Sequence, residues 1–272
     1  MGGVKEAAVA DQVVVFQAQS EFERARCALG GFGPAVRAVE PPPEIADVAV
    51  PYLVVCDAAR PALHAAIEKG LLVAGQVWYR EPLPTALADL GPRPGPDDAV
   101  GRIAIAFVAP CIAEEDDLRL TAQVEKDLAP VMPYLNADLR GGTYAPAGPT
   151  FTFMDGPRLI NLFPHRIVIG RLREMQDAWR TLKAVKNRVN DVWGRRAAIR
   201  PCHERRRGLS ALEIYQRLPR TNCRQCGEAT CLAFAARLLS GDQHLARCLP
   251  VMTGEHQRLR PVLEDLLAAV GL

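Results

Sequence analysis

Four cysteines lie close together near the C-terminal end of the chain: Cys223, Cys226, Cys231 and Cys248. Their spacing is C-x2-C-x4-C-x16-C. Thiolate sulfur is a preferred ligand of iron–sulfur clusters. Three sulfurs on one short loop can bind one side of a cluster while a distant fourth closes the site. The spacing therefore predicts one four-iron four-sulfur (4Fe-4S) cluster with these four cysteines as its iron ligands.

The residues around the cysteines suit a bulky group with a net negative charge. Gly227 directly follows Cys226 and allows the loop to turn tightly. Cys231 opens an apolar helix that is predicted to run to Ser240 and to end at Gly241, so the cluster would lie at a helix N-terminus, where negative charge is favoured. Nearby arginines would offset the charge of the cluster and its thiolates. These are Arg220, Arg224, Arg237 and Arg247.

Three alternatives for the same cysteines stay open: a structural zinc site, two disulfides, or four free thiols in a core. The chain is neither short nor marked for secretion, which argues against a disulfide framework. Zinc ribbons typically use two short cysteine pairs, whereas 16 residues separate the last two cysteines here. Because cytosolic thiols at ligand spacing usually bind metal, metal analysis separates the cluster from zinc.

A set of short motifs around the cysteines carries a family resemblance. They are Leu218-Pro219, Asn222-Cys223, Cys226-Gly227-Glu228, Thr230-Cys231, Ala233-Phe234-Ala235, and Cys248 followed by Pro250. On these motifs, residues 208 to 270 resemble the 4Fe-4S module shared by the corrinoid iron–sulfur protein large subunit, the acetyl-CoA decarbonylase/synthase gamma subunit and the Rnf-type B subunit. The resemblance implies a cluster ligated by the four cysteines. In corrinoid proteins that cluster serves reductive activation of cobalt, so the resemblance also implies a redox partner, such as a corrinoid protein or a one-carbon enzyme.

The resemblance stops outside this module. In the corrinoid proteins the module precedes a TIM barrel and a corrinoid-binding domain, whereas here it comes last. The Rnf subunit carries further ferredoxin motifs and a membrane anchor, and neither occurs in this sequence. We therefore expect that the chain itself does not bind a corrinoid.

Among the other cysteines, three invite a functional interpretation. Cys56 ends the apolar run PYLVVC, and Cys111 follows a strand and precedes the acidic run 114–117. The N-terminal part faintly resembles small sulfur- or selenium-carrier domains, which makes Cys56 a candidate working thiol. The simpler interpretations are a buried strand thiol for Cys56 and a helix N-terminus at the acidic run after Cys111. Cys202, beside His203, lies in the basic stretch 195–207, where it could supply a fifth ligand or a redox thiol near the cluster module. The simpler interpretation is an incidental cysteine in an exposed connection.

Six elements are predicted in the first 81 residues, in the order βαββαβ. Strands alternate with helices that begin at a capping serine or after a proline and end at glycine. The predicted elements are strand 12–18, helix 20–30, strand 35–39, strand 51–59, helix 61–69 and strand 75–80. This order is typical of a ferredoxin-like unit, in which two helices cover one face of an antiparallel sheet.

A Pro- and Gly-rich stretch at 82–99 has the composition of a linker. We predict strands after it at 102–110, 150–154, 158–163 and 165–170. The pair Asp155-Gly156 is a hairpin signal, the acidic run 114–117 is expected to open a helix, and apolar residues every 3 to 4 positions predict a long amphipathic helix over 174–196. The fold class is therefore α+β. The predicted divisions are a ferredoxin-like domain at 1–81, a linker at 82–99, a second small α/β domain at 100–196 and a helical 4Fe-4S module at 197–272.

The composition excludes several classes of function. The chain has 272 residues, of which 49% are hydrophobic and 24% charged, with a net charge of +2. This is too mild for a dedicated nucleic-acid binder. We find no transmembrane run and no signal-peptide core, and we expect a cytoplasmic protein. There is no P-loop, dinucleotide fingerprint, Ser-His-Asp set or carboxylate pair, so the sequence assigns no catalytic residue.

The sequence therefore favours an iron–sulfur redox protein that performs electron transfer or reductive activation for a partner enzyme. One alternative is a maturation factor that handles sulfur or metal, with Cys56 or Cys111 as its working thiol. The other is an interaction protein stabilised by zinc.

Overall fold

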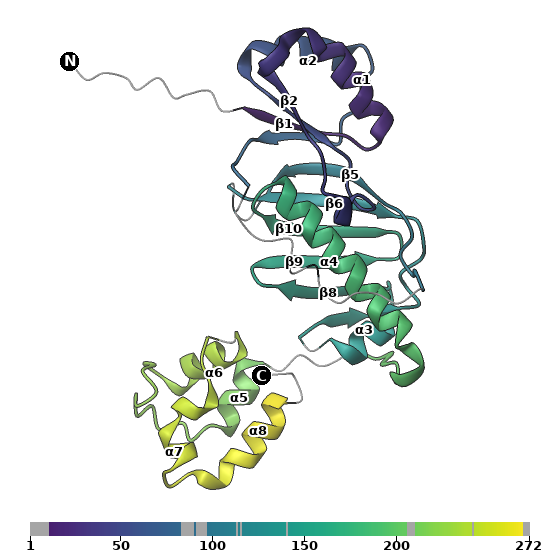
Figure 1. Cartoon of the computed structure of the whole chain (residues 1–272). Helices are drawn as coiled ribbons and strands as arrows, with labels where there is room; N and C mark the ends of the chain where they lie inside the picture. Colours follow the sequence, from purple (N-terminus) through teal and green to yellow (C-terminus); the bar gives the residue numbers. More distant parts are fainter. Residues whose placement is uncertain are drawn as a thin grey trace, which may run out of the picture. The chain divides into compact units, whose positions relative to one another are not determined.

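A computed structural model describes residues 11–82, 90, 97–112, 114, 116–139, 141–205, 210–240 and 242–268. It contains both helices and antiparallel sheets, which confirms the α+β class (Figure 1). The chain forms two compact units. The N-terminal unit comprises Met1–Asp138 and Tyr144–Glu204, and the C-terminal unit comprises Leu139–Thr143 and Arg205–Leu272.

The first sheet has the topology that the sequence predicts for a ferredoxin-like unit. Its strand order is β2-β3-β1-β4, and each neighbouring pair is antiparallel. The six elements are β1 (Gln12–Val15), α1 (Gln19–Leu29), β2 (Val36–Val39), β3 (Tyr52–Val55), α2 (Arg60–Glu68) and β4 (Gly75–Trp78). Short 3-10 turns connect them at Gly30–Ala35, Pro43–Ile45 and Asp57–Ala59.

Both faces of this sheet are buried at its central strand β3, which explains why β3 is apolar throughout. Successive strand residues point to opposite faces. Leu53 and Val55 pack with the apolar side chains of α1 and α2, which lie together on one side of the sheet in Figure 1. Tyr52 faces the other way, and its ring lies 5.1 Å from that of Trp179, centroid to centroid. Trp179 belongs to the long helix α4 (Met175–Gly194), so α4 helps to cover the second face.

The second sheet has six strands in the order β5-β6-β10-β9-β8-β7. They are β5 (Ile103–Pro110), β6 (Leu118–Val124), β7 (Thr143–Ala145), β8 (Thr150–Asp155), β9 (Arg158–Phe163) and β10 (Arg166–Leu172). A short helix, α3 (Met132–Asp138), follows β6, and α4 runs across the sheet (Figure 1). The predicted hairpin at Asp155-Gly156 and the predicted long helix are both confirmed.

The helix predicted to open on the acidic run 114–117 is wrong. The chain instead turns at Asp117 and returns as β6, antiparallel to β5. The backbone N–H of Cys111 donates to the carbonyl of Asp117 across this turn at 2.8 Å. From Leu118 to Val124 every second residue is buried, so the period-two pattern of a strand outweighs the acidic signal of a helix N-terminus. Ala113 and Glu115 lie outside the described residues.

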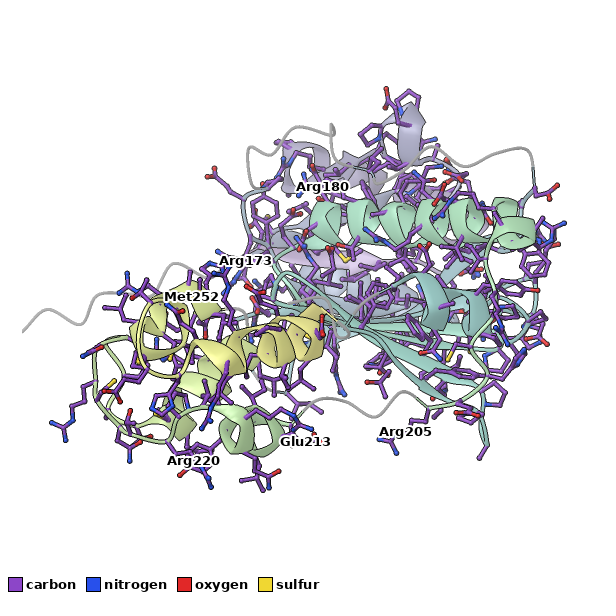
Figure 2. All side chains as sticks on the ribbon, turned by 90° about the horizontal axis from the view of Figure 1, so that it is seen from below. Arg173, Arg180, Arg205, Glu213, Arg220 and Met252 are labelled. Atoms are coloured by element: carbon purple, nitrogen blue, oxygen red, sulfur yellow. The ribbon has the colours of Figure 1, made fainter. Side chains whose placement is uncertain are left out.

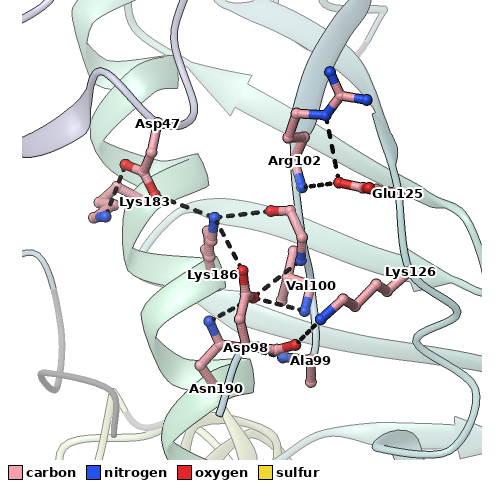
Figure 3. A network of polar contacts seen from close by, with 11 residues as sticks. Asp47, Asp98, Ala99, Val100, Arg102, Glu125, Lys126, Lys183, Lys186 and Asn190 are labelled. Atoms are coloured by element: carbon pink, nitrogen blue, oxygen red, sulfur yellow. Dashed lines mark hydrogen bonds and ion pairs between the residues drawn. The ribbon is translucent and has the colours of Figure 1, made fainter. Parts of the chain in front are cut away.

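A polar network fixes the segment before β5 onto α4 (Figure 3). The buried Nζ of Lys186 donates to the carbonyl of Gly101 at 2.8 Å and pairs with Asp47 at 3.1 Å and with Asp98 at 3.7 Å. Asp98 also accepts hydrogen bonds from the backbone N–H groups of Val100 and Gly101. A buried ammonium requires such partners, so the network determines where the chain enters the second sheet. Most of the predicted linker 82–99 lies outside the described residues, and the predicted domain boundaries stay predictions.

The C-terminal unit is a small helical module around its own core. Its elements are α5 (Ala211–Arg217), α6 (Cys231–Leu239), a turn at Leu245–Arg247, α7 (Leu249–Met252), a turn at Gln257–Leu259 and α8 (Arg260–Ala268). Ser210 and Glu213 form a capping box that begins α5. Ile214, Phe234 and Leu263 are among the residues of the core. No helix in the described part of the chain is long and apolar enough to cross a bilayer.

Candidate metal centre

The loop between α5 and α6 has an unusual backbone. Of the four non-glycine residues with positive φ in the described part of the chain, three lie here at every second position: Arg220, Asn222 and Arg224, with φ between 50° and 60°. Gly227 follows with φ 90°. A left-handed conformation costs an L-residue about 1–2 kcal/mol. Loops with repeated left-handed residues turn successive N–H groups inward and form anion-binding hollows, many of which hold phosphate or iron–sulfur groups.

The four predicted cysteine ligands all lie on this loop and its neighbouring elements. Cys223 is exposed, whereas Cys226, Cys231 and Cys248 are only 8%, 9% and 7% exposed and belong to the small core. Cys231 is the first residue of α6, and Cys248 immediately precedes α7. The structure thus places one cysteine at the surface and three inside the module.

The Cys248 thiol is affected both by its burial and by the other three cysteines. Burial raises the pKa of the Cys248 thiol, and the charges of Cys226, Cys231 and Cys223 raise it further. The backbone N–H of Val251 opposes this by favouring the thiolate. Thiols that disfavour one another's ionisation become good ligands when a positive metal centre lies between them, because metals bind the deprotonated form.

Asn222 joins the loop to the start of α6. Its backbone N–H donates to Sγ of Cys231 at 3.4 Å, and its side-chain Oδ1 accepts from the N–H of Cys231 at 2.8 Å. The first N–H groups of a helix have no partner within the helix, so Asn222 satisfies one of them while Thr230 accepts from the N–H of Ala233. Sequence reasoning gave Asn222 no role of its own. The available signal was that asparagine tolerates the left-handed conformation better than most residues.

The four arginines near the site are not equivalent. Arg237 pairs with Glu228 at 3.5 Å, and Gln243 donates to the same carboxylate at 3.0 Å. Arg220, Arg224 and Arg247 are exposed and form no ion pair within the described part of the chain. Figure 2 labels Arg220 on the C-terminal unit. These three guanidinium groups therefore keep their charge available.

A hollow of about 430 Å³ lies beside Cys223. Thr221 and Gln225 line it from the loop, and the residues of α7 and the turn after it complete the wall. The lining residues after Cys248 are Leu249, Pro250, Thr253, Gly254, Glu255 and His256. Only one of the four cysteines therefore borders this hollow.

The donor set fits an anionic iron–sulfur group. It consists of thiols alone, at the N-terminus of a nine-residue helix and beside a loop wound for anion binding. Among the described residues, no three Cys, His, Asp or Glu side chains gather closely enough to hold a single metal ion.

The remaining cysteines are spread over the N-terminal unit. Cys27 is exposed on α1, and Cys56 is half-buried directly after β3 rather than inside a strand. Cys111 is buried at the end of β5. Cys202 is half-buried, and its N–H donates to the carbonyl of Pro133 at 2.9 Å. The structure does not bring these four residues together into a second site.

Comparison with protein-family models gives one match, over residues 218–250, to a family described as "Putative Fe-S cluster". The match includes all four cysteines. No solved structure matches the chain.

Curated relatives match a short stretch of the chain. The acetyl-CoA decarbonylase/synthase complex subunit gamma of Methanothermobacter thermautotrophicus is 42% identical over 60 residues, which are 22% of this chain and 12% of the relative. The corrinoid/iron–sulfur protein large subunit of Moorella thermoacetica is 42% identical over 64 residues, 24% of this chain and 14% of the relative. The subunit gamma 2 of Methanosarcina thermophila is 49% identical over 71 residues, 23% and 15%. The predicted resemblance is confirmed, and the chain spans less than a sixth of these relatives' length.

Proposed function

We propose that the chain is a redox protein that binds one 4Fe-4S cluster through Cys223, Cys226, Cys231 and Cys248. The observation that carries the proposal is the placement of four thiols on a loop of repeated left-handed residues and on the elements that adjoin it, one of them at a helix N-terminus. Thiolates are the usual ligands of such clusters, and backbone N–H groups stabilise their charge.

The chain's own residues have distinct roles in this proposal. Three of the four cysteines are buried, which keeps water away from most of the site, and the backbone N–H of Asn222 donates to the sulfur of Cys231. Hydrogen bonds to sulfur and solvent exposure are what set the reduction potential of a cluster. When bound, the cluster supplies one electron at a time.

The names of the relatives support a partner in one-carbon or corrinoid chemistry. They describe subunits of an acetyl-CoA decarbonylase/synthase complex and a corrinoid/iron–sulfur protein. Because each of these matches covers less than a quarter of this chain, the partner is inferred from a short stretch alone. We propose electron transfer or reductive activation of such a partner in the cytoplasm, with any two-electron chemistry completed by the partner.

A structural zinc is the second candidate, because zinc also binds four thiolates, but in the described part of the chain no three such side chains lie close enough to hold one metal ion. Iron, acid-labile sulfide and zinc analysis of anaerobically purified protein distinguishes the two. We expect about four irons and four sulfides per chain, and loss of most iron in Cys226→Ala. Cys56→Ser, a thiol in the N-terminal unit, is the matched control and keeps its iron. Zinc at about one per chain without sulfide would overturn the cluster proposal.

A further inference from the structure

The four cysteines differ in how much protein covers them. Cys226, Cys231 and Cys248 are buried, whereas Cys223 is exposed and borders the 430 Å³ hollow. A redox partner comes closest to a buried centre where the covering protein is thinnest. The Cys223 side of the module is therefore the side that a partner can approach.

The hollow beside Cys223 has an apolar wall with polar surroundings. Leu249 is 48% exposed and lines it together with Pro250. Thr221, Gln225 and Thr253 contribute polar side chains to the same wall. An apolar centre surrounded by polar residues is the usual composition of a protein–protein interface.

Two exposed arginines without an ion pair in the described part of the chain adjoin the lining residues in the sequence. Arg224 lies in the chain between two lining residues, Cys223 and Gln225, and Arg220 directly precedes the lining residue Thr221. Both arginines have positive φ, which glycine or asparagine adopts at lower energy. Backbone geometry therefore does not explain why arginine stands at these positions. Exposed guanidinium groups that lack an ion pair are suited to bind carboxylates of another protein.

The carboxylates of the module mostly lie on other elements. Glu213 is on α5, Glu264 and Asp265 are on α8, and Glu228 pairs with Arg237. Glu255 is the acidic residue among those that line the hollow. The charge of a bound cluster would lie among three buried cysteines, whereas the arginines are exposed.

We propose that the surface formed by Arg220, Arg224, Arg247 and the hollow beside Cys223 docks a redox protein with an acidic surface. The partner supplies or takes one electron, and no bond forms or breaks. This inference rests on the proposed function, because it assumes a cluster in the module. Charge complementarity speeds encounter and orients the partner.

The test uses two small oxidants of equal and opposite charge on the dithionite-reduced holoprotein. Tris(oxalato)cobaltate(III) is a trianion and hexaamminecobalt(III) is a trication, and each takes one electron to give cobalt(II). We expect the anion to react faster. In Arg220→Glu/Arg224→Glu the ratio of the anion's rate constant to the cation's falls roughly tenfold at low ionic strength, a typical size for electrostatic steering. The difference shrinks near 1 M salt, where the Debye length is about 3 Å.

Arg217→Glu/Arg260→Glu is the matched control, since it changes the net charge equally at residues that neither line the hollow nor adjoin a lining residue in the chain. Its ratio should stay close to that of the unchanged protein. A second measurement does not depend on electron transfer. The redox-inert, paramagnetic anion hexacyanochromate(III) should broaden amide NMR signals of residues 220–225 and 253–256 in the holoprotein, and this broadening should weaken in the double variant.

Iron and sulfide analysis of each variant separates this inference from the proposed function. A chain without a cluster fails the proposed function itself. If both double variants keep the cluster and its reduction potential but show the same rate ratio, or if the chromium anion broadens residues elsewhere, the docking surface is wrong while the cluster stands.

Discussion

Asn222 should contribute to retention of the cluster out of proportion to its exposed position. Its side chain accepts the hydrogen bond from the N–H of Cys231, and its backbone N–H donates to the sulfur of the same residue. Asn222→Gly removes the side-chain acceptor but keeps the left-handed backbone at little strain. Asn222→Ala removes the same acceptor and places a less tolerant residue at φ 50°. The two substitutions therefore separate the hydrogen bond from the backbone conformation.

The expected magnitudes follow from these two contributions. A lost hydrogen bond destabilises by about 0.5–1.5 kcal/mol, and the left-handed strain of alanine adds about 1 kcal/mol. We expect Asn222→Gly to lose its cluster to an iron chelator roughly fivefold faster than the unchanged protein, and Asn222→Ala roughly thirtyfold faster. Both variants keep the backbone N–H of residue 222, but the loss of the side-chain hydrogen bond to Cys231 should weaken the N–H···S bond to the same residue. A weaker N–H···S bond should lower the reduction potential of the cluster. A loss of about 0.5–1 kcal/mol from the reduced state corresponds to roughly 20–40 mV for one electron.

The assay follows the visible absorbance of the holoprotein under anaerobic chelation, and a redox titration by electron paramagnetic resonance gives the potential. Gln225→Ala, an exposed position in the same loop, is the control and should behave like the unchanged protein. Equal rates for both Asn222 variants would refute the contribution of backbone strain. Rates equal to that of the unchanged protein would refute the contribution of the hydrogen bond as well.

Three further predictions concern the rest of the chain. In Gly75→Ala the added Cβ would overlap the carbonyl oxygen of Val108, so we expect the free energy of unfolding to fall by at least about 2 kcal/mol. Tryptophan fluorescence during urea unfolding measures this loss, and an unchanged unfolding midpoint would contradict the packing. Lys186→Met removes the centre of the network in Figure 3 and should cost about 1–3 kcal/mol in the same assay, whereas Lys69→Met, an exposed control, should cost almost nothing. In the metal-free protein the raised pKa of the Cys248 thiol means that the folded state holds its proton more tightly than the unfolded state. Stability of the metal-free protein should therefore fall as pH rises above the usual thiol pKa of about 8.5, as measured by circular dichroism, and a stability that rises over this range would contradict the buried placement of Cys248.

The ferredoxin-like unit could be predicted because its signals are local. Short apolar runs alternate with helices, and the strand order follows from that succession. The first helix ends at Gly30 as predicted, but the predicted serine cap is wrong: the helix begins at Gln19, after Ala18, without a side-chain cap. The burial of both faces of the sheet could not be predicted. It depends on the contact between Tyr52 and Trp179, which lie far apart in the sequence. The apolar run of β3 indicated a buried strand but not what covers it.

The error at residues 114–117 arose from giving one signal too much weight. An acidic run suits a helix N-terminus, but the alternation of buried residues from Leu118 to Val124 is stronger evidence for a strand. The expectation of a buried strand thiol at Cys56 was also wrong, because β3 ends at Val55 and Cys56 is half-buried in the turn that follows.

The candidate site could be predicted as far as residue types and spacing reach. The spacing identified the four cysteines, and the structure brings them into one module. The left-handed backbone at Arg220, Asn222 and Arg224 could not be predicted, since arginine is not a typical residue for that conformation. The ion pair of Arg237 with Glu228 could not be predicted from the sequence either. It distinguishes that arginine from Arg220, Arg224 and Arg247, which form no ion pair in the described part of the chain.

Native mass spectrometry of the anaerobically purified chain tests the central claim most directly, because one spectrum reports the mass of everything that is bound. The account predicts a mass increase equal to four irons and four sulfides, which disappears in Cys226→Ala and persists in Cys56→Ser. An increase equal to a single zinc ion, or a cluster that remains in Cys226→Ala, would contradict it.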